Sequence, residues 1–122
     1  MPLLHGEITE QIIGAAFEVH RVLGYGFLEK VYQRVMIVEL GFRGIIALDE
    51  EPIKVYYKDQ IVGDYEADLL IPDKVIVELK IAKEDNAYDE AQLLNELKAT
   101  GIRVGLLINF GREKVEFKRF IL

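Results

Sequence analysis

The chain of 122 residues has no cysteine, no long apolar run and too few basic residues to balance its acids. Without cysteine it can form no disulfide and no cysteine zinc site, which favours a reducing compartment. No apolar run approaches the roughly 20 residues that span a bilayer, and no basic segment followed by an apolar one marks the N-terminus. We therefore expect a soluble cytoplasmic protein with no membrane partner.

Basic residues are also fewer than acidic ones. Fifteen Lys and Arg residues stand against 21 Asp and Glu residues, a formal net charge of −6. This is the wrong sign for a domain that holds nucleic acid by general electrostatics, so any contact with DNA or RNA is expected to be weak and transient. Lys114, Lys118 and Arg119 form either a local basic strip or the solvated face of the last strand.

The length suits one domain, residues 1–122, which can bury about 60–70% of its unfolded surface. Apolar spacing predicts two helices on either side of Gly24-Tyr25-Gly26, and a third that is capped by Asp85 or Asn86 and closed by Gly101. A short β-rich run at 45–48 precedes an acidic turn at 49–52. The expected helices cover 7–23, 27–40 and the segment up to 100, and the expected strands cover 53–57, 61–71, 75–81, 104–109 and 115–120.

The first three strands follow one another closely and predict a meander. The strand-helix-strand segment from 75 to 109 should place its second strand parallel to its first through a right-handed crossover. The expected fold class is therefore mixed α/β (α+β), a mixed β-sheet flanked by helices in the order ααβββαββ.

Charges interrupt two apolar strand-like runs in the segment 68–80. Pro72-Asp73-Lys74 has turn chemistry, so the flanking runs are predicted to pair as a β-hairpin. A three-residue loop pairs Ile71 with Val75, whereas a two-residue loop would shift the register by one residue. The first register is the expected one.

That register predicts a cluster of charge. It places Asp68 opposite Glu78 and Glu66 opposite Lys80, all on the face that also carries Leu70 and Ile76. Opposed carboxylates about 5 Å apart repel each other and destabilise a sheet, and a divalent cation bound between them would remove this repulsion. Lys80 would lie diagonally from Asp68, at about 7–8 Å. The other face is expected to be core and holds Tyr65, Ala67, Leu69, Ile71, Val75, Val77, Leu79 and Ile81.

Two motifs carry a resemblance to known proteins. Asp68, then nine residues, then Glu78-Leu79-Lys80 is similar to the D-x(n)-E-x-K signature of the PD-(D/E)XK nuclease superfamily, and the order of elements resembles its restriction-endonuclease-like core. Gly26-Phe27-Leu28-Glu29-Lys30-Val31-Tyr32 looks like the motif of the GxxExxY family, a compact branch of that superfamily. Further similar segments lie at 14–20, 92–95, 97–101 and 106–111.

The resemblance implies a metal-dependent nuclease that hydrolyses phosphodiester bonds in DNA or RNA with Mg²⁺ or Mn²⁺. Carried over residue by residue, it makes Asp68 and Glu78 metal ligands and Lys80 the catalytic lysine. The backbone carbonyl of Leu79 is a further candidate ligand. Glu29 becomes a helix-borne acid of the site and a candidate ligand, although in isolation it is simply a stabilising acid in the first turn of a helix.

The same resemblance makes Gln92 a helix-borne residue that faces the site, although a lone glutamine flanking an apolar stripe points to solvent equally well. The family frequently has a histidine shortly before this glutamine and a tyrosine shortly after it. This chain has Asp89 and Glu96 there.

Two alternatives stay open. The chain is either a catalytically active nuclease or a catalytically inactive nuclease-fold protein that acts as a protein or nucleic-acid interaction module. Because the chain is rich in apolar residues, we also expect that it can form a homodimer, through the strand at 115–120 or through the helical hairpin.

Overall fold

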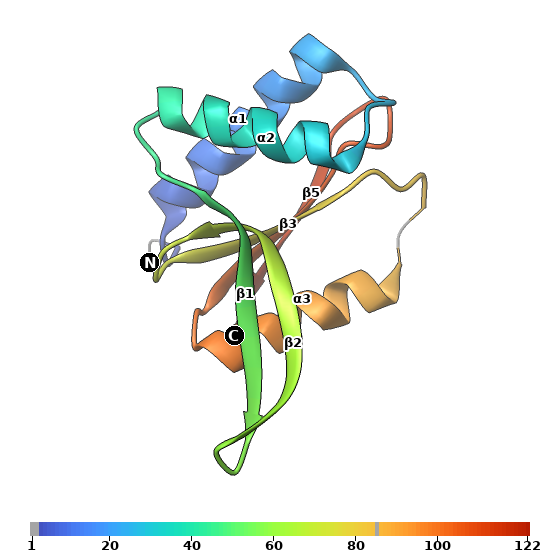
Figure 1. Cartoon of the computed structure of the whole chain (residues 1–122). Coiled ribbons are helices and arrows are strands. Elements are labelled where there is room, and N and C mark those ends of the chain that lie inside the picture. The colour runs from blue at the N-terminus through green and yellow to red at the C-terminus, as the bar shows by residue number, and fades with distance from the viewer. Residues whose placement is uncertain (1–2, 85) are drawn as a thin grey trace.

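A computed structural model of the chain describes residues 3–84 and 86–122. Within these residues, three helices and five strands follow one another in the predicted order (Figure 1). The helices are α1 (Gly6–Leu23), α2 (Glu29–Phe42) and α3 (Ala87–Thr100), and the strands are β1 (Leu48–Tyr57), β2 (Gln60–Ile71), β3 (Val75–Lys80), β4 (Val104–Asn109) and β5 (Glu116–Ile121). No described helix is long and apolar enough to cross a bilayer.

The five strands form one sheet in the order β1-β2-β3-β4-β5. Only β3 and β4 are parallel, joined through α3, and the other neighbours are antiparallel. Both the meander and the parallel crossover pair are thereby confirmed. Figure 1 shows α1 and α2 together over one face of the sheet and α3 over the opposite face.

Both faces of the sheet are buried, so the prediction of a single core face was wrong. Leu70 and Ile76 pack with Leu93 and Leu97 of α3, while Leu69 and Val77 belong to the larger cluster beneath α1 and α2. Tyr65 and Ala67 also lie in the α3 cluster instead of sharing a cluster with Leu69. A crossover helix covers the second face of a parallel pair, which the pattern of one hairpin cannot reveal.

The β2–β3 hairpin has the predicted register. Ile71 pairs with Val75, Leu70 with Ile76 and Leu69 with Val77. The amide of Lys74 donates to the carbonyl of Ile71 at 3.0 Å across the turn. The charged residues therefore follow directly after the last apolar pair of the hairpin.

Several element boundaries differ from the expectation. β1 runs without interruption through Pro52, where a turn was predicted; because β1 is an edge strand, a proline there costs no hydrogen bond within the sheet. α2 includes Gly41 and ends at Phe42. Asn86 caps α3 by accepting a hydrogen bond from the amide of Tyr88, and Asp85, the other cap candidate, lies outside the described residues.

The link between α1 and α2 is held by Tyr32. Its hydroxyl donates to the carbonyl of Gly24 at 2.6 Å and accepts from the amide of Phe27 at 3.4 Å. The ring stacks on Phe110 at the end of β4, with 4.6 Å between ring centroids. These contacts fix the N-terminus of α2, and with it Glu29, relative to the sheet.

Candidate active site at the end of the β2–β3 hairpin

The candidate site begins where β2 and β3 separate. The amide of Asp68 donates to Glu78 Oε2 at 3.3 Å, and the amide of Leu79 donates to Asp68 Oδ2 at 2.8 Å. Each carboxylate therefore reaches across to the backbone of the other strand, in place of the next backbone ladder bonds. Asp68 and Glu78 are brought together as the register predicted.

Lys80 has a different partner from the predicted one. The β2–β3 ladder ends at Leu69 and Val77, so Glu66 is not held opposite Lys80; it is exposed and pairs with Pro52 of β1. Lys80 Nζ instead lies 3.5 Å from Asp89 Oδ1 in the first turn of α3. The expectation failed because the two strands diverge immediately after the acid pair.

Helix α2 contributes two residues. Glu29, its first residue, is half-buried, and burial and then the negative charge of Asp68 raise the pKa of its carboxyl. One turn later, Gln33 Nε2 donates to the carbonyl of Asp68 at 2.8 Å. Glu29 thus lies within the electrostatic field of the cluster, and Gln33 holds the backbone that carries Asp68.

Helix α3 places a third carboxyl behind the hairpin. Glu96 has an exposed fraction of 0%, and its Oε2 accepts a hydrogen bond from Gln92 Nε2 at 3.0 Å. Glu78 is 3% exposed, and Glu96 is one of the groups that raise the pKa of its carboxyl. The Oε1 atom of each is buried without a partner among the described residues.

These contacts change the proton affinity of the cluster. Burial, a hydrogen bond with Glu96 and the charge of Asp68 raise the pKa of Glu78 far above its ordinary range. For Lys80, burial lowers the pKa, but Asp89, Glu29, Glu78 and Asp68 together raise it more. The lysine is therefore a cation at neutral pH.

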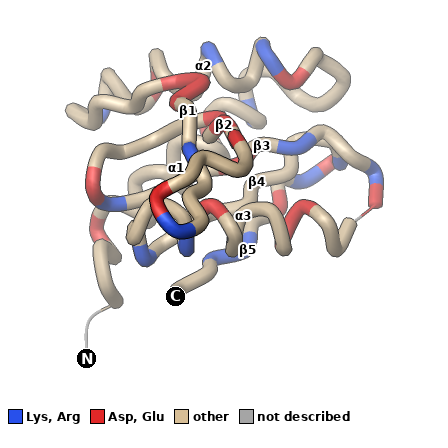
Figure 2. The backbone as a smooth tube through the Cα atoms, turned by 60° about the horizontal axis from the view of Figure 1, so that its bottom comes forward, with Lys and Arg blue, Asp and Glu red and all other residues tan. Residues whose placement is uncertain are grey.

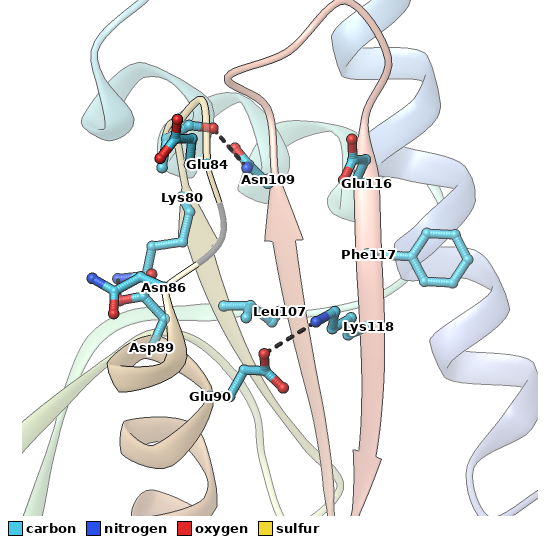
Figure 3. Close-up of a pocket in the computed structure, with 11 residues that line it drawn as sticks. Lys80, Glu84, Asn86, Asp89, Glu90, Leu107, Asn109, Glu116, Phe117 and Lys118 are labelled. Carbon is cyan, nitrogen blue, oxygen red and sulfur yellow. Dashed lines mark hydrogen bonds and ion pairs between the residues drawn. The ribbon is translucent and has the colours of Figure 1, made fainter.

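A small pocket of about 60 Å³ opens beside Lys80, between the first turn of α3 and strands β4 and β5 (Figure 3). On its far side Lys118 Nζ pairs with Glu90 Oε2 at 3.0 Å, and Asn109 Nδ2 donates to the carbonyl of Ala82 at 2.7 Å. Its lining comprises Lys80, Ala82, Glu84, Asn86, Asp89, Glu90, Leu107, Asn109, Glu116, Phe117 and Lys118. The pocket thus gives Lys80 access to solvent.

The donor chemistry of the cluster fits a hard divalent cation. Asp68 and Glu78 offer carboxylate oxygens, and Glu78 Oε1 is buried with no hydrogen-bond donor to satisfy it. Across residues 3–84 and 86–122, no three Asp, Glu, His or Cys side chains are arranged to surround one metal ion. Carboxylate oxygens such as these are the ligands that Mg²⁺ and Mn²⁺ prefer in proteins.

Comparison with known proteins agrees with this arrangement. Residues 6–120 match the family model of the PD-(D/E)XK nuclease superfamily, and the chain belongs to that superfamily. Its restriction-endonuclease-like fold class is consistent with the mixed five-stranded sheet flanked by helices. Nucleases of this superfamily generally use Mg²⁺ or Mn²⁺.

Among solved structures, the crystal structure of SSO0001 is similar in fold, with a TM-score of 0.53 and 15% sequence identity over 98% of this chain and 80% of that chain. No curated protein matches the chain.

Three residues of the cluster were not among the predicted site residues. Asp89 and Glu96 were noted only as departures from the family pattern, and Gln33 was not singled out. Glu96 could have been found as an acid within a buried stripe, because it lies three residues after Leu93 and directly before Leu97.

Proposed function

We propose that this protein is a metal-dependent phosphodiesterase of the GxxExxY branch of the superfamily, acting on DNA or RNA. The observation that carries the proposal is the contact between Asp68 and Glu78 at the end of one hairpin, with a buried oxygen of Glu78 left unpaired and the charge of Lys80 within electrostatic range of both acids. A carboxylate pair can hold a divalent cation that polarises the phosphate, and a neighbouring ammonium group can stabilise the negative charge that develops during hydrolysis.

In this proposal Asp68 and Glu78 hold the cation, and the carbonyl of Leu79 and the carboxyl of Glu29 are further candidate ligands. Bound Mg²⁺ or Mn²⁺ would supply Lewis-acid polarisation of the phosphate and a more acidic water. Lys80 is charged, so its ammonium group would stabilise negative charge on the phosphate oxygens and orient a water, instead of abstracting a proton. Gln92 acts through Glu96 in this scheme.

The GxxExxY assignment is supported by the structural roles of Gly26, Glu29 and Tyr32, the three positions that name the motif. Gly26 has a φ of 109°, a conformation that favours glycine. Tyr32 ties down the link that precedes α2, and Glu29 is thereby presented to the acid cluster. In this proposal the motif acts as one structural unit that keeps the carboxyl of Glu29 within the electrostatic field of Asp68.

Calorimetric titration of Mn²⁺ into the wild type and into Asp68→Ala tests the metal site. We expect saturable binding to the wild type and loss of binding in the variant. Asp64→Ala is the matched control, because Asp64 lies on the same strand but is exposed and pairs with Lys54. Equal binding by wild type and Asp68→Ala would refute the assignment of the ligands.

Cleavage of single- and double-stranded DNA and of RNA, with and without Mn²⁺, tests the chemistry. Glu78→Ala and Lys80→Ala should each abolish metal-dependent cleavage, while Asp64→Ala retains it. Cleavage unchanged in both variants would identify a contaminating nuclease.

The second candidate function is a catalytically inactive interaction module. It is favoured by the Lys80–Asp89 ion pair, which satisfies the lysine without a metal, and by the net charge of −6. Figure 2 shows basic residues spread over several elements and interspersed with acidic ones, so nucleic-acid contacts would be weak and transient. Wild-type protein that binds no Mn²⁺ would favour this second function.

We also propose a cytoplasmic location, from the lack of cysteine, and a homodimer through β5. This strand forms one edge of the sheet and exposes 43% of Phe117 and 53% of Ile121. Sedimentation equilibrium of the wild type and of Ile121→Lys tests the dimer: we expect a dimeric wild type and a monomeric variant. A monomeric wild type would refute it.

A further inference from the structure

Lys118 lies on the face of the sheet that also carries the candidate active site. It pairs with Leu107 of β4, which in turn pairs with Glu78 of β3, so the three residues form one row across the sheet. Side chains alternate along a strand, and the next residue of β5, Arg119, instead donates to the carbonyl of Leu4 near the N-terminus. Lys118 and Arg119 therefore serve different faces and do not form one basic strip.

The small pocket beside the site connects Lys118 with Lys80. Both lysines line it, one from β3 and the other from β5, with Leu107 and Asn109 of β4 between them (Figure 3). Two strand spacings separate β3 from β5, which is roughly 10 Å. One strand of DNA carries a phosphate about every 3.4 Å of helix axis. A single nucleic-acid strand that crosses the pocket can therefore bring a different phosphate to each lysine.

Two adjacent acids in the first turn of α3 contact the same two lysines. Asp89 Oδ1 lies 3.5 Å from Lys80 Nζ, and Glu90 Oε2 lies 3.0 Å from Lys118 Nζ. The side chains of Lys118 and Glu90 are 51% and 32% exposed, and ion pairs as exposed as this contribute little to stability. A phosphate oxygen accepts the same charge-assisted hydrogen bond as a carboxylate, so it can replace Glu90 at Lys118 at small cost.

We propose that Lys118 is a substrate-binding residue: its ammonium group binds a second phosphate of the nucleic-acid strand whose scissile phosphate lies beside Lys80, and Glu90 competes with that phosphate. The inference rests on the proposed function and adds a substrate contact outside the acid cluster. Competition by Glu90 also accounts for weak binding of nucleic acid, in addition to the net charge of −6.

Fluorescence anisotropy of labelled single-stranded DNA and RNA of one sequence, in EDTA and over a range of NaCl concentrations, tests the phosphate contact without metal or cleavage. Lys118→Met should weaken binding and reduce the slope of log K against log salt by about 1, because one phosphate contact is lost. This reduction is expected with either nucleic acid, since both carry the same phosphate. Lys118→Arg keeps the charge and should preserve both values.

Lys74→Met is the matched control for loss of one positive charge. Lys74 is exposed in the turn before β3, at the opposite end of that strand from Lys80, so its replacement should leave the salt slope unchanged.

The effect of Glu90 is tested with the same oligonucleotides. Glu90→Gln should tighten binding in the wild-type background but not in the Lys118→Met background, because the competition acts only through Lys118. Glu10→Gln removes an exposed acid of α1 and measures the general effect of net charge, so it should tighten binding less than Glu90→Gln. An equal gain from Glu90→Gln in both backgrounds would overturn the competition.

The same affinity and salt slope in the wild type and Lys118→Met, or an equal loss in Lys74→Met, would overturn the inference. The proposed function would still stand if the wild type binds Mn²⁺ and cleaves nucleic acid. A wild type that neither binds Mn²⁺ nor cleaves would instead overturn the proposed function, and this inference with it.

Discussion

The face of the sheet beneath α1 and α2 is filled by aliphatic and aromatic side chains, whereas the face beneath α3 encloses the carboxyl groups of Glu78 and Glu96 beside a smaller apolar cluster. Apolar burial stabilises the first face at every pH. On the second face, the ionised carboxylates cost free energy unless a proton or a cation neutralises them. One face of the sheet therefore stabilises the fold, whereas the other holds a polar site that lowers stability.

The largest expected effect comes from breaking the apolar face. Leu106 is fully buried beneath α1 and α2, so Leu106→Ala should lower the free energy of unfolding by about 2–5 kcal/mol, because it leaves a cavity. Urea denaturation measures the loss. The adjacent Leu107→Ala is the control: Leu107 is only half-buried on the α3 face, and a smaller loss is expected. A greater loss at Leu107 would reverse the comparison.

The next effect concerns pH and the α3 face. Because the pKa of Glu78 is raised above its ordinary value of 4.5, the folded state keeps a proton that the unfolded state releases. In the absence of metal, stability should therefore fall as pH rises above about 4.5, by up to roughly 1.4 kcal/mol per pH unit. Glu78→Gln should flatten this dependence, since the amide does not ionise.

Unfolding free energies from urea denaturation between pH 5 and pH 8 provide the measurement. Glu66→Gln serves as the control, because Glu66 is an exposed acid on the neighbouring strand, and its replacement should preserve the wild-type slope. An equally steep slope in Glu78→Gln would show that another group is responsible.

A smaller effect is expected at Gln33, which links the two faces. It belongs to α2 on the apolar face but donates to the carbonyl of Asp68. Gln33→Leu should cost about 1 kcal/mol, since a buried carbonyl loses its donor, and should also weaken Mn²⁺ binding by loosening Asp68. Unfolding and calorimetry together measure both effects, with exposed Arg34→Ala as the neutral neighbour. Unaltered Mn²⁺ affinity would place Gln33 outside the site.

The smallest effect should come from the ion pair of Lys118 and Glu90, at the rim of the pocket. The Lys118 side chain is 51% exposed, and exposed pairs contribute about 0–1 kcal/mol. A double-mutant cycle with Glu90→Gln and Lys118→Met should give a coupling within that range, decreasing with added salt. A coupling energy well above about 1 kcal/mol would show that polar contacts also stabilise the edge of the α3 face.

Local chemistry made much of the fold predictable. The cap at Asn86, the closing glycine at 101 and the turn at 72–74 each act through residues close by in the chain, and all lie where expected. The segment 49–52 was misread because acids and a proline resemble a turn, yet they occupy an edge strand. Its conformation is set by pairing with β2, which lies farther along the chain.

The candidate site divides in the same way. A hairpin register places Asp68 and Glu78 together without reference to the rest of the molecule, so this pair was predictable. Glu96 and Gln33 were not, because their contacts depend on how α3 and α2 dock on the sheet. Nor could the hairpin alone reveal that Lys80 would pair with Asp89.

The sequence by itself determined the order of elements, the hairpin register and the resemblance that marks Asp68, Glu78 and Lys80, because strand alternation and turn chemistry operate over a few residues. The tertiary structure decided that both faces of the sheet are buried and that Glu78 is enclosed with Glu96. Burial and electrostatic coupling depend on which surfaces meet in space, and Glu96 acts on Glu78 only because α3 packs on that face of the sheet.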